Sequence, residues 1–293
     1  MSLAVLRRRD ALILALVCAA SAAQAERITL LDRQTAYQRL LVVEDTQRRE
    51  RYLYGDDLQY MQGMISLQRP QDLLPDYLRS ALLGLVFAPP EPAALLFVGL
   101  GPGSMPRYLS PRYPRARLDA VEIDPEVPPV ARRYFALPDA ANLKVAVRDG
   151  REFIRMQKAN QYDLVLMDAY FGPEVPRHLA TLEFMAELRR TMKPGGVVVA
   201  NLLAPELAPD FWPVVATYRA AFVHVRLFAT DTPWSFMLLA SDTTLSAEPA
   251  ATQARVRQLK SRHRIDVDLA ALARLLPPWG SAFEDAPVLH DAR

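Results

Sequence analysis

Residues and motifs that define several common enzyme classes are scarce or missing in this chain. Its only cysteine, Cys18, lies in an N-terminal apolar segment, so the chain beyond that segment offers no disulfide, thiol nucleophile or thiolate metal ligand. The four histidines are scattered, without a spacing that would bring them together around a metal ion. The sequence also lacks a Gly-x-x-x-x-Gly-Lys phosphate loop and a Gly-x-Ser-x-Gly nucleophile elbow. We therefore expect no metal site and neither P-loop nor serine-hydrolase chemistry.

A large excess of charge of one sign is missing as well. The chain carries 35 basic and 33 acidic residues, which give a formal net charge of +2. Without Arg7, Arg8, Arg9 and Asp10, which lie in the N-terminal segment, 32 residues of each sign remain. Nucleic-acid binding needs an excess of positive charge to neutralise phosphates, so nucleic acid is not an expected partner.

The first 25 residues have the composition of a secretory signal peptide. Three arginines precede an apolar run over residues 11–20, and Ala23-Gln24-Ala25 supplies the small residues that signal peptidase requires. This pattern predicts cleavage after Ala25 and export, to the periplasm. The apolar run is short for a membrane span, and we expect no stable membrane insertion after the signal is cleaved. The alternatives are an uncleaved anchor or a misassigned start codon, in which case the protein would be cytoplasmic.

The pattern of apolar residues changes along the chain and divides it into segments. Residues 26–70 alternate apolar and polar positions between turn residues, which predicts a small antiparallel β domain. Residues 71–92 predict a helix from Pro75 to Val86 and a proline-rich linker. Residues 93–245 alternate apolar strands with helix-length segments, and residues 246–293 form a tail with helices at 250–262 and 266–276. The expected strands of the large segment are 95–99, 117–122, 143–147, 163–168, 196–201, 221–228 and 234–241.

This order predicts an α/β fold: a Rossmann-like sheet of the class I methyltransferase type, with helices on both faces, preceded by a small antiparallel β domain. The last two strands leave no room for a helix between them, so they should pair antiparallel. The apolar run over residues 95–98 ends in Gly99, Gly101 and Gly103, where glycines allow a sharp turn and a close approach of the backbone to a ligand. A second apolar run ends in Glu122, at about the twenty-residue offset of an acid that binds ribose hydroxyls. Together they indicate a nucleoside site, although glycines after a strand also occur as plain tight turns.

Several segments resemble the spermidine synthase family, the polyamine aminopropyltransferases, and especially its divergent spermidine synthase-like bacterial branch. The segments that carry the resemblance are 121–127 (Val-Glu-Ile-Asp-Pro-Glu-Val), 148–153 (Arg-Asp-Gly-Arg-Glu-Phe), 162–168 (Tyr-Asp-Leu-Val-Leu-Met-Asp), 193–197 (Lys-Pro-Gly-Gly-Val), Tyr37-Gln38, Met61-Gln62-Gly63 and 285–288 (Asp-Ala-Pro-Val). The resemblance implies a transferase of polyamine biosynthesis on a methyltransferase-like fold, with a homodimer as its assembly.

Carried over by position, the resemblance implies a site for decarboxylated S-adenosylmethionine or S-adenosylmethionine. Glu122 would hold the ribose hydroxyls, Asp149 the adenine amino group, and Gly150 would leave room for the ring, while Gln38 and Gln62 would reach the ligand from the small sheet. The alternatives are a solvated strand-end acid at Glu122, an Asp-Gly turn at Asp149, and surface positions for the glutamines. Asp124 precedes a proline and is expected to cap a helix and not to bind a ligand.

Asp168 stands where the family has its general base. An amine can attack the carbon beside a sulfonium only after losing a proton, and an amine of pKa about 10 is mostly protonated at neutral pH. A carboxylate accepts that proton best when burial raises its pKa. The alternative is an acid that only caps the following loop.

The family's anchors for positive charge are replaced in this chain. Phe171 stands in place of a second acid, Leu78 in place of a histidine, Arg79 in place of a glutamate and Pro102 in place of the acid of the glycine loop. A polyamine carries at least two positive charges, so putrescine is not the expected acceptor. The expected substrate pocket for a small amine or another small acceptor consists of Tyr77, Arg79, Tyr170, Phe171 and Trp234.

Three functions remain open at this point. The first is an aminopropyltransferase-like enzyme in which Asp168 is the base. The second is an S-adenosylmethionine-dependent methyltransferase-like enzyme, because Pro102 removes an acid that would repel the carboxylate of S-adenosylmethionine. The third is a non-catalytic exported binder of small molecules, which the signal peptide favours because sulfonium nucleosides are made in the cytoplasm.

Overall fold

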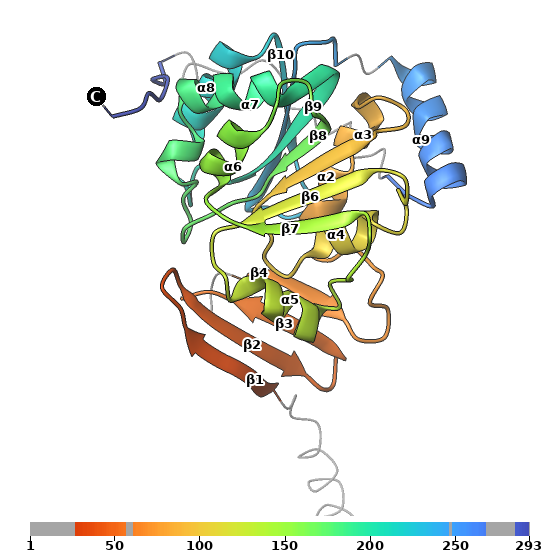
Figure 1. Ribbon diagram of the computed structural model, residues 1–293, viewed down its shortest axis with the longest axis vertical. Coiled ribbons are helices and arrows are strands. Elements are labelled where there is room, and N and C mark those ends of the chain that lie inside the picture. The colour runs from red at the N-terminus through yellow and green to blue at the C-terminus, as the bar shows by residue number, and fades with distance from the viewer. Residues whose placement is uncertain (1–26, 57–60, 246–247, 268–284, 293) are drawn as a thin grey trace, which may run out of the picture.

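The protein contains two β-sheets, and the smaller one, formed by the N-terminal part of the chain, lies at one end of the molecule (Figure 1). The computed structural model describes residues 27–56, 61–245, 248–267 and 285–292. The small sheet has the order β1-β2-β3-β4 and every pairing in it is antiparallel, which confirms the small antiparallel sheet predicted for this part of the chain. Its strands are β1 (Arg27–Gln34), β2 (Arg39–Asp45), β3 (Glu50–Tyr54) and β4 (Met61–Ser66).

The large sheet has the order β10-β11-β9-β8-β5-β6-β7. Strands β5 to β9 pair in parallel, whereas β11 pairs antiparallel with both β9 and β10. The predicted α/β fold with a parallel sheet and an antiparallel ending is therefore confirmed. The strands are β5 (Ala94–Val98), β6 (Arg117–Glu122), β7 (Leu143–Val147), β8 (Tyr162–Met167), β9 (Met192–Leu203), β10 (His224–Ala229) and β11 (Ser235–Ser241).

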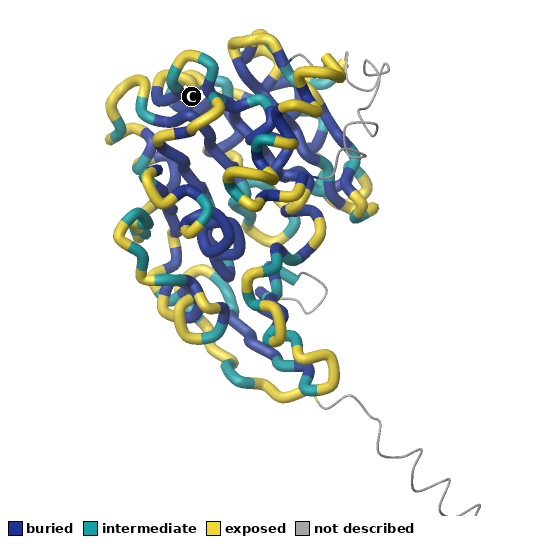
Figure 2. Tube along the Cα trace, turned by 90° about the vertical axis from the view of Figure 1, so that its right-hand side faces the viewer, coloured by how far each residue is buried: buried dark blue, intermediate teal, exposed yellow. Residues whose placement is uncertain are grey.

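Helices cover both faces of the large sheet because its inner strands are apolar on both sides. One face packs Leu95 and Phe97 of β5 against α2, α3, α4, α5 and α9, and the other packs Leu96 and Val98 against α6, α7 and α8. Figure 2 shows most of the buried chain in this larger part of the molecule, whereas β1 at the edge of the small sheet is exposed. The helices are α2 (Tyr77–Ala81), α3 (Gly84–Phe87), α4 (Ser104–Leu109), α5 (Val127–Phe135), α6 (Gly150–Met156), α7 (Leu182–Thr191), α8 (Phe211–Ala221) and α9 (Pro249–His263), with a 3-10 turn η1 (Arg177–Leu179).

The single helix predicted from Pro75 to Val86 is wrong, because the chain forms two short helices, α2 and α3, with a turn at Leu82 and Leu83. Every residue from 82 to 86 is buried, which one continuous amphipathic helix could not achieve. Gly84 of α3 packs against β9, where an added Cβ would lie 2.3 Å from Val199 Cγ2.

The two ends of the chain differ in how far the structure describes them. The tail helix predicted at 250–262 is confirmed as α9. The helix predicted at 266–276 falls mainly on residues 268–284 and the signal segment on residues 1–25, both outside the described residues. Among the described helices, none is long and apolar enough to cross a bilayer.

Candidate functional site

The carboxyl ends of β5, β6 and β8 lie next to one another, because the strand order places β5 between β8 and β6. In parallel sheets of this kind, ligands bind in the crevice beyond these strand ends. Gly99, Gly101 and Gly103 follow β5 with φ angles of +93°, +51° and +72°, which favour glycine. A Cβ at Gly99 would lie 2.2 Å from the carbonyl oxygen of Asp168, so the glycine loop packs directly on the end of β8.

Glu122 ends β6 beneath the glycine loop, with only 8% of its surface exposed. Its Oε2 accepts a hydrogen bond from Leu100 N at 3.0 Å and its Oε1 one from Asp124 N at 3.0 Å. Burial raises the pKa of Glu122, and these backbone donors oppose that rise. Backbone N–H groups, that of Gly101 among them, thus hold the carboxylate in place at the end of β6.

The Ile123 side chain, beside Glu122, is 40% exposed and supplies apolar surface next to this acid. The sequence analysis did not single it out. An apolar residue between two acids of a strand-end turn was the available signal.

Asp149 begins α6 and caps it. Its Oδ1 accepts hydrogen bonds from Arg151 N at 2.9 Å and Glu152 N at 3.0 Å, and its Oδ2 lies 2.7 Å from Nε2 of His178. Burial alone would raise the pKa of Asp149, but the hydrogen bonds from Glu152 N–H and His178 outweigh burial and hold that pKa below its usual value. The helix-cap role is therefore present, and Oδ2 still has room for a second donor.

Gly150 follows this acid and is packed against β5. A Cβ there would lie 2.9 Å from Val98 Cγ1 and 3.6 Å from Leu179 Cδ2. The contact of α6 with the sheet thus accounts for a glycine at this position.

Asp168 lies half-buried just beyond β8, held between two elements. Tyr77 Oη of α2 donates to its Oδ2 at 3.2 Å, and Asn201 Nδ2 of β9 donates to its Oδ1 at 2.9 Å. Asn201 is oriented in turn by the Ser235 hydroxyl, which donates to its Oδ1 at 2.8 Å. Burial raises the pKa of Asp168, and the hydrogen bonds from Asn201 and Tyr77 oppose that rise. A fixed carboxylate with a raised pKa suits a proton acceptor.

Asn201 and Ser235 were missed by the sequence analysis. Asn201 is the one amide in the apolar run of β9, and this was the available signal. Ser235 begins β11 and gave none.

Three of the five residues predicted for the substrate pocket gather near Asp168. Tyr77 donates to it, the ring of Trp234 lies 6.3 Å from that of Tyr77, and Tyr170 Oη donates to the backbone carbonyl of Asn201 at 2.6 Å. Phe171 is 68% exposed on the loop after β8, free to line the mouth of a site but not packed into it.

Arg79 is not brought to this group. Its guanidinium lies 3.7 Å from Asp76 and its Nε donates to the Leu73 carbonyl at 3.4 Å, on the exposed side of α2. Residues two apart on a helix point about 200° away from each other, so Arg79 cannot share a side with Tyr77.

The small sheet closes one side of the glycine loop. A Cβ at Gly63 would lie 2.4 Å from Cγ of Pro102, so β4 and the loop are in direct contact. Next to Gly63, the side-chain amide of Gln62 donates to that of Gln38. The two glutamines therefore pair with each other, and the Gln62 carbonyl oxygen is 3.8 Å from the Cβ position at Gly101.

Asp124 is fully buried, and its carboxylate is occupied by donors of the protein itself. Its Oδ1 accepts from Glu126 N at 2.9 Å at the start of α5, and its Oδ2 accepts from the Thr35 hydroxyl at 2.7 Å. The acid thus joins the turn between β1 and β2 to the segment after β6. An open hollow of about 490 Å³ lies beside this contact, lined by residues 33–36 and 124–126.

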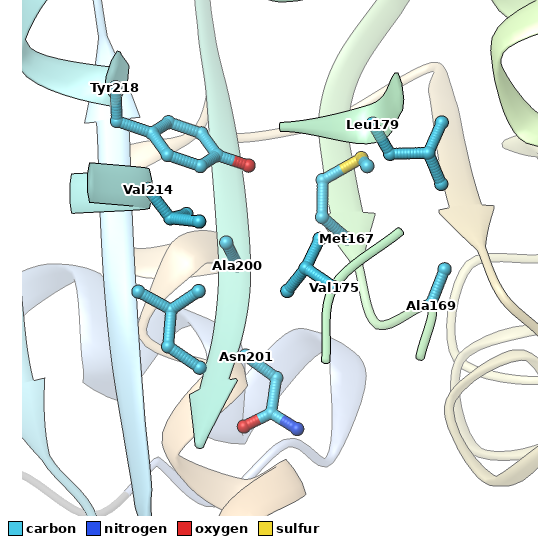
Figure 3. Close-up of a pocket in the computed structure, with 9 residues that line it drawn as sticks. Met167, Ala169, Val175, Leu179, Ala200, Asn201, Val214 and Tyr218 are labelled. Carbon is cyan, nitrogen blue, oxygen red and sulfur yellow. The ribbon is translucent and has the colours of Figure 1, made fainter. Parts of the chain in front are cut away.

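A second cavity lies on the opposite face of the sheet from Tyr77, between the end of β9 and α8 (Figure 3). It offers about 10 Å³, room for roughly one water molecule. The Tyr218 hydroxyl is directed toward it, while the remaining walls are largely apolar (Figure 3). It is too small for a substrate and is not the acceptor site. Its lining consists of Met167, Ala169, Val175, Leu179, Ala200, Asn201, Leu202, Val214 and Tyr218.

The described ranges contain no group of three or more His, Cys, Asp or Glu side chains arranged to hold a metal ion. The acids at the strand ends are instead bound by backbone N–H groups, hydroxyls and amides.

Comparisons with known proteins agree with this arrangement. Residues 82–239 match the family described as the spermine/spermidine synthase domain. A polyamine aminopropyltransferase from Vibrio vulnificus (strain CMCP6) is 33% identical over 226 residues, which cover 76% of this chain and 70% of that protein.

Two solved structures extend the comparison to the fold. A probable spermidine synthase from Corynebacterium glutamicum ATCC 13032 superposes with a TM-score of 0.71 at 23% identity, covering 90% of this chain and 96% of that one. Human methyltransferase-like protein 13 in complex with SAH superposes with a TM-score of 0.56 at 26% identity, covering 64% of this chain and 93% of that one. The methyltransferase-like sheet predicted from the sequence is thus confirmed.

Proposed function

The chain belongs to the spermine/spermidine synthase family, and from this premise we propose that it transfers an aminopropyl group from decarboxylated S-adenosylmethionine to a small amine other than putrescine. In this proposal Glu122 binds the ribose hydroxyls and Asp149 the adenine amino group, and the glycine loop passes along the nucleoside. Gln38 and Gln62 close the site from the small sheet.

The environment of Asp168 is the observation that carries the proposal. A new N–C bond forms between the amine and the methylene next to the sulfonium, the C–S bond breaks, and its electron pair neutralises the sulfur to a thioether. The amine must give up a proton, and Asp168, whose pKa is raised by burial, accepts it. Tyr77 and Asn201 hold the carboxylate by hydrogen bonds of 3.2 and 2.9 Å, so the acid does not have to reorganise during the reaction.

The class of acceptor follows from the side chains that replace the family's anchors for positive charge. Leu78 is buried with 4% exposure, Pro102 packs on Gly63, and Phe171 is apolar and exposed, so none supplies a second negative charge. Arg79 faces away, so repulsion by its guanidinium no longer contributes to the argument against putrescine. A single carboxylate at Asp168 matches an acceptor with one positive charge better than a diamine.

Methyl transfer is the second candidate function. The similarity to human methyltransferase-like protein 13, whose structure contains SAH, favours it. The apolar Pro102 leaves the carboxylate of S-adenosylmethionine unopposed. A non-catalytic nucleoside binder is the third candidate, and it fits best with the proposed export to the periplasm, since sulfonium nucleosides are made in the cytoplasm. A homodimer is proposed on family grounds alone.

Calorimetric titration of the protein with S-adenosylmethionine, its decarboxylated form and methylthioadenosine tests these candidates. We expect the decarboxylated form to bind most tightly. Glu122→Gln keeps the shape of the side chain but removes its charge, so its affinity for this nucleoside should fall about 10- to 100-fold, as for loss of a hydrogen bond to a charged group. Glu126→Gln changes a half-exposed acid of the same turn, which pairs with Arg33 on the small sheet, and serves as the matched control, with affinity unchanged.

Each outcome decides between the candidates. Preference for S-adenosylmethionine would favour methyl transfer. Binding of none of the three nucleosides would eliminate both transferase functions. Equal affinity in Glu122→Gln and wild type would remove Glu122 from the site.

A further inference from the structure

His178 and Asp149 form a hydrogen-bonded pair at the nucleobase end of the proposed site, although they lie on different elements. Nε2 of His178, in η1, is 2.7 Å from Oδ2 of Asp149, at the start of α6. The other oxygen, Oδ1, is already occupied by two backbone N–H groups of α6. Because an ionised carboxylate only accepts hydrogen bonds, Nε2 carries the proton and donates it. The backbone of α6 at Oδ1 and His178 at Oδ2 therefore together fix the direction in which Oδ2 presents its remaining lone pair.

Arg151 of α6 connects α6 to η1. Its side chain is 7% exposed, and Nη1 donates to the backbone carbonyl of His178 at 3.3 Å. The guanidinium also makes paired bonds to Asp291 at 2.6 and 2.7 Å and to Glu187 at 3.0 and 2.8 Å. Paired arginine–carboxylate bonds fix orientation as well as distance. Arg151 thus connects Asp291 to His178 of η1, because it bonds to both.

Hydrogen bonds to α7 and α8 fix the position of the C-terminal segment that carries Asp291. Leu182 N donates to the Leu289 carbonyl at 2.8 Å, and Leu289 N donates to the Thr217 hydroxyl at 2.9 Å. Asp291 also accepts a bond from the Thr181 hydroxyl at 2.8 Å. Residues near the end of the chain are therefore built into the wall behind Asp149.

We propose that His178 determines specificity for a 6-amino purine at Asp149, and that Asp291, acting through Arg151, positions His178. The inference rests on the proposed nucleoside site and deepens it. With Oδ2 ionised and oriented, its free lone pair accepts a bond from an exocyclic amino group. A 6-oxo purine presents an acceptor at the same place, which meets the carboxylate as an unpaired, repulsive contact.

Titration with methylthioadenosine and methylthioinosine, which differ in this one group, tests the proposal in the full-length protein. Wild type should prefer the adenine nucleoside. His178→Ala leaves Oδ1 held by the backbone of α6 but removes the donor at Oδ2, so the ratio of the two affinities should fall about tenfold, as for the loss of one orienting hydrogen bond. His178→Gln keeps an N–H donor and should restore most of the ratio. Asp291→Asn should lower the ratio in the same direction by a smaller factor, about threefold.

His290→Ala is the matched control, because His290 also pairs with an acid, Glu183 at 3.0 Å, but does not touch Arg151 or Asp149. It should leave the ratio unchanged, which separates specificity from general weakening of the tail. An unchanged ratio in His178→Ala, with both nucleosides still bound, would overturn the inference and leave the proposed function intact. If wild type bound neither nucleoside, the proposed site and the inference would both be wrong.

Discussion

Substitution of Gly99 by alanine tests the junction between the glycine loop and the end of β8. Gly99 has a φ of +93°, and a Cβ there would lie 2.2 Å from the Asp168 carbonyl oxygen and 2.8 Å from its carbonyl carbon. Positive φ costs an alanine about 1–2 kcal/mol. The contact with backbone atoms, which cannot rotate away, adds about 1–3 kcal/mol of the kind seen on overpacking a core. We therefore expect Gly99→Ala to lower the free energy of unfolding by about 2–5 kcal/mol.

Gly195→Ala is the matched control. Gly195 has a φ of +78°, but nothing lies within 4 Å of its Cβ position. Gly195→Ala should lower the free energy of unfolding only by the cost of positive φ, about 1–2 kcal/mol. Any gain from reduced freedom of the unfolded chain is the same in both variants and cancels in the comparison. Urea unfolding followed by circular dichroism measures both. If Gly99→Ala destabilised the protein no more than Gly195→Ala, the close approach of the loop to Asp168 would be refuted.

Two further predictions concern charged groups. Tyr77→Phe removes a donor to the ionised form of Asp168, so the pKa of Asp168 should rise further, as measured by carbon-13 titration of the carboxyl. Tyr170→Phe is the control, because the Tyr170 hydroxyl donates to the Asn201 carbonyl and not to Asp168. An unchanged pKa of Asp168 in Tyr77→Phe would contradict the assignment. Hydrogen bonds from Arg151 and Thr181 lower the pKa of Asp291 to about 2. The stability that Asp291 contributes is therefore complete above its unfolded pKa of about 4 and is lost as pH falls to about 2. The free energy of unfolding of Asp291→Asn should accordingly differ from that of wild type at pH 7 by no more than about 1 kcal/mol, because the side chain is partly exposed. The two free energies should converge at pH 2. A difference that does not depend on pH would exclude the ion pair as the cause.

The strands and the acids at their ends could be predicted because both leave local patterns. Residues 117–122 and 143–147 are bounded apolar runs, and they coincide with β6 and β7. Glu122 and Asp168 stand directly at strand ends, and parallel strands bring such residues to one edge of a sheet. The pairing of the last two strands followed from the short connection between them.

The contacts that orient these acids could not be predicted, because they join residues far apart in the sequence. Neither Asn201 beside Asp168 nor His178 beside Asp149 has a spacing that marks it, since each comes from a separate element that the fold brings alongside. Asp291 is tied to Arg151 by contacts that no local pattern encodes.

The placement of Arg79 in the substrate pocket differs from these cases, because it depends on a local pattern. The helical repeat already places it opposite Tyr77, so the sequence contained the information.

The contact between Gly63 and Pro102 also constrains how this site can change by mutation. The proline ring occupies the space that a side chain at residue 63 would need, so a larger residue at one position is compatible only with a smaller one at the other. Replacing Pro102 with an acid would therefore also change the contact between the glycine loop and β4. The two positions therefore form an epistatic pair, and a substitution in the glycine loop at residue 102 has to be compatible with the small sheet at residue 63.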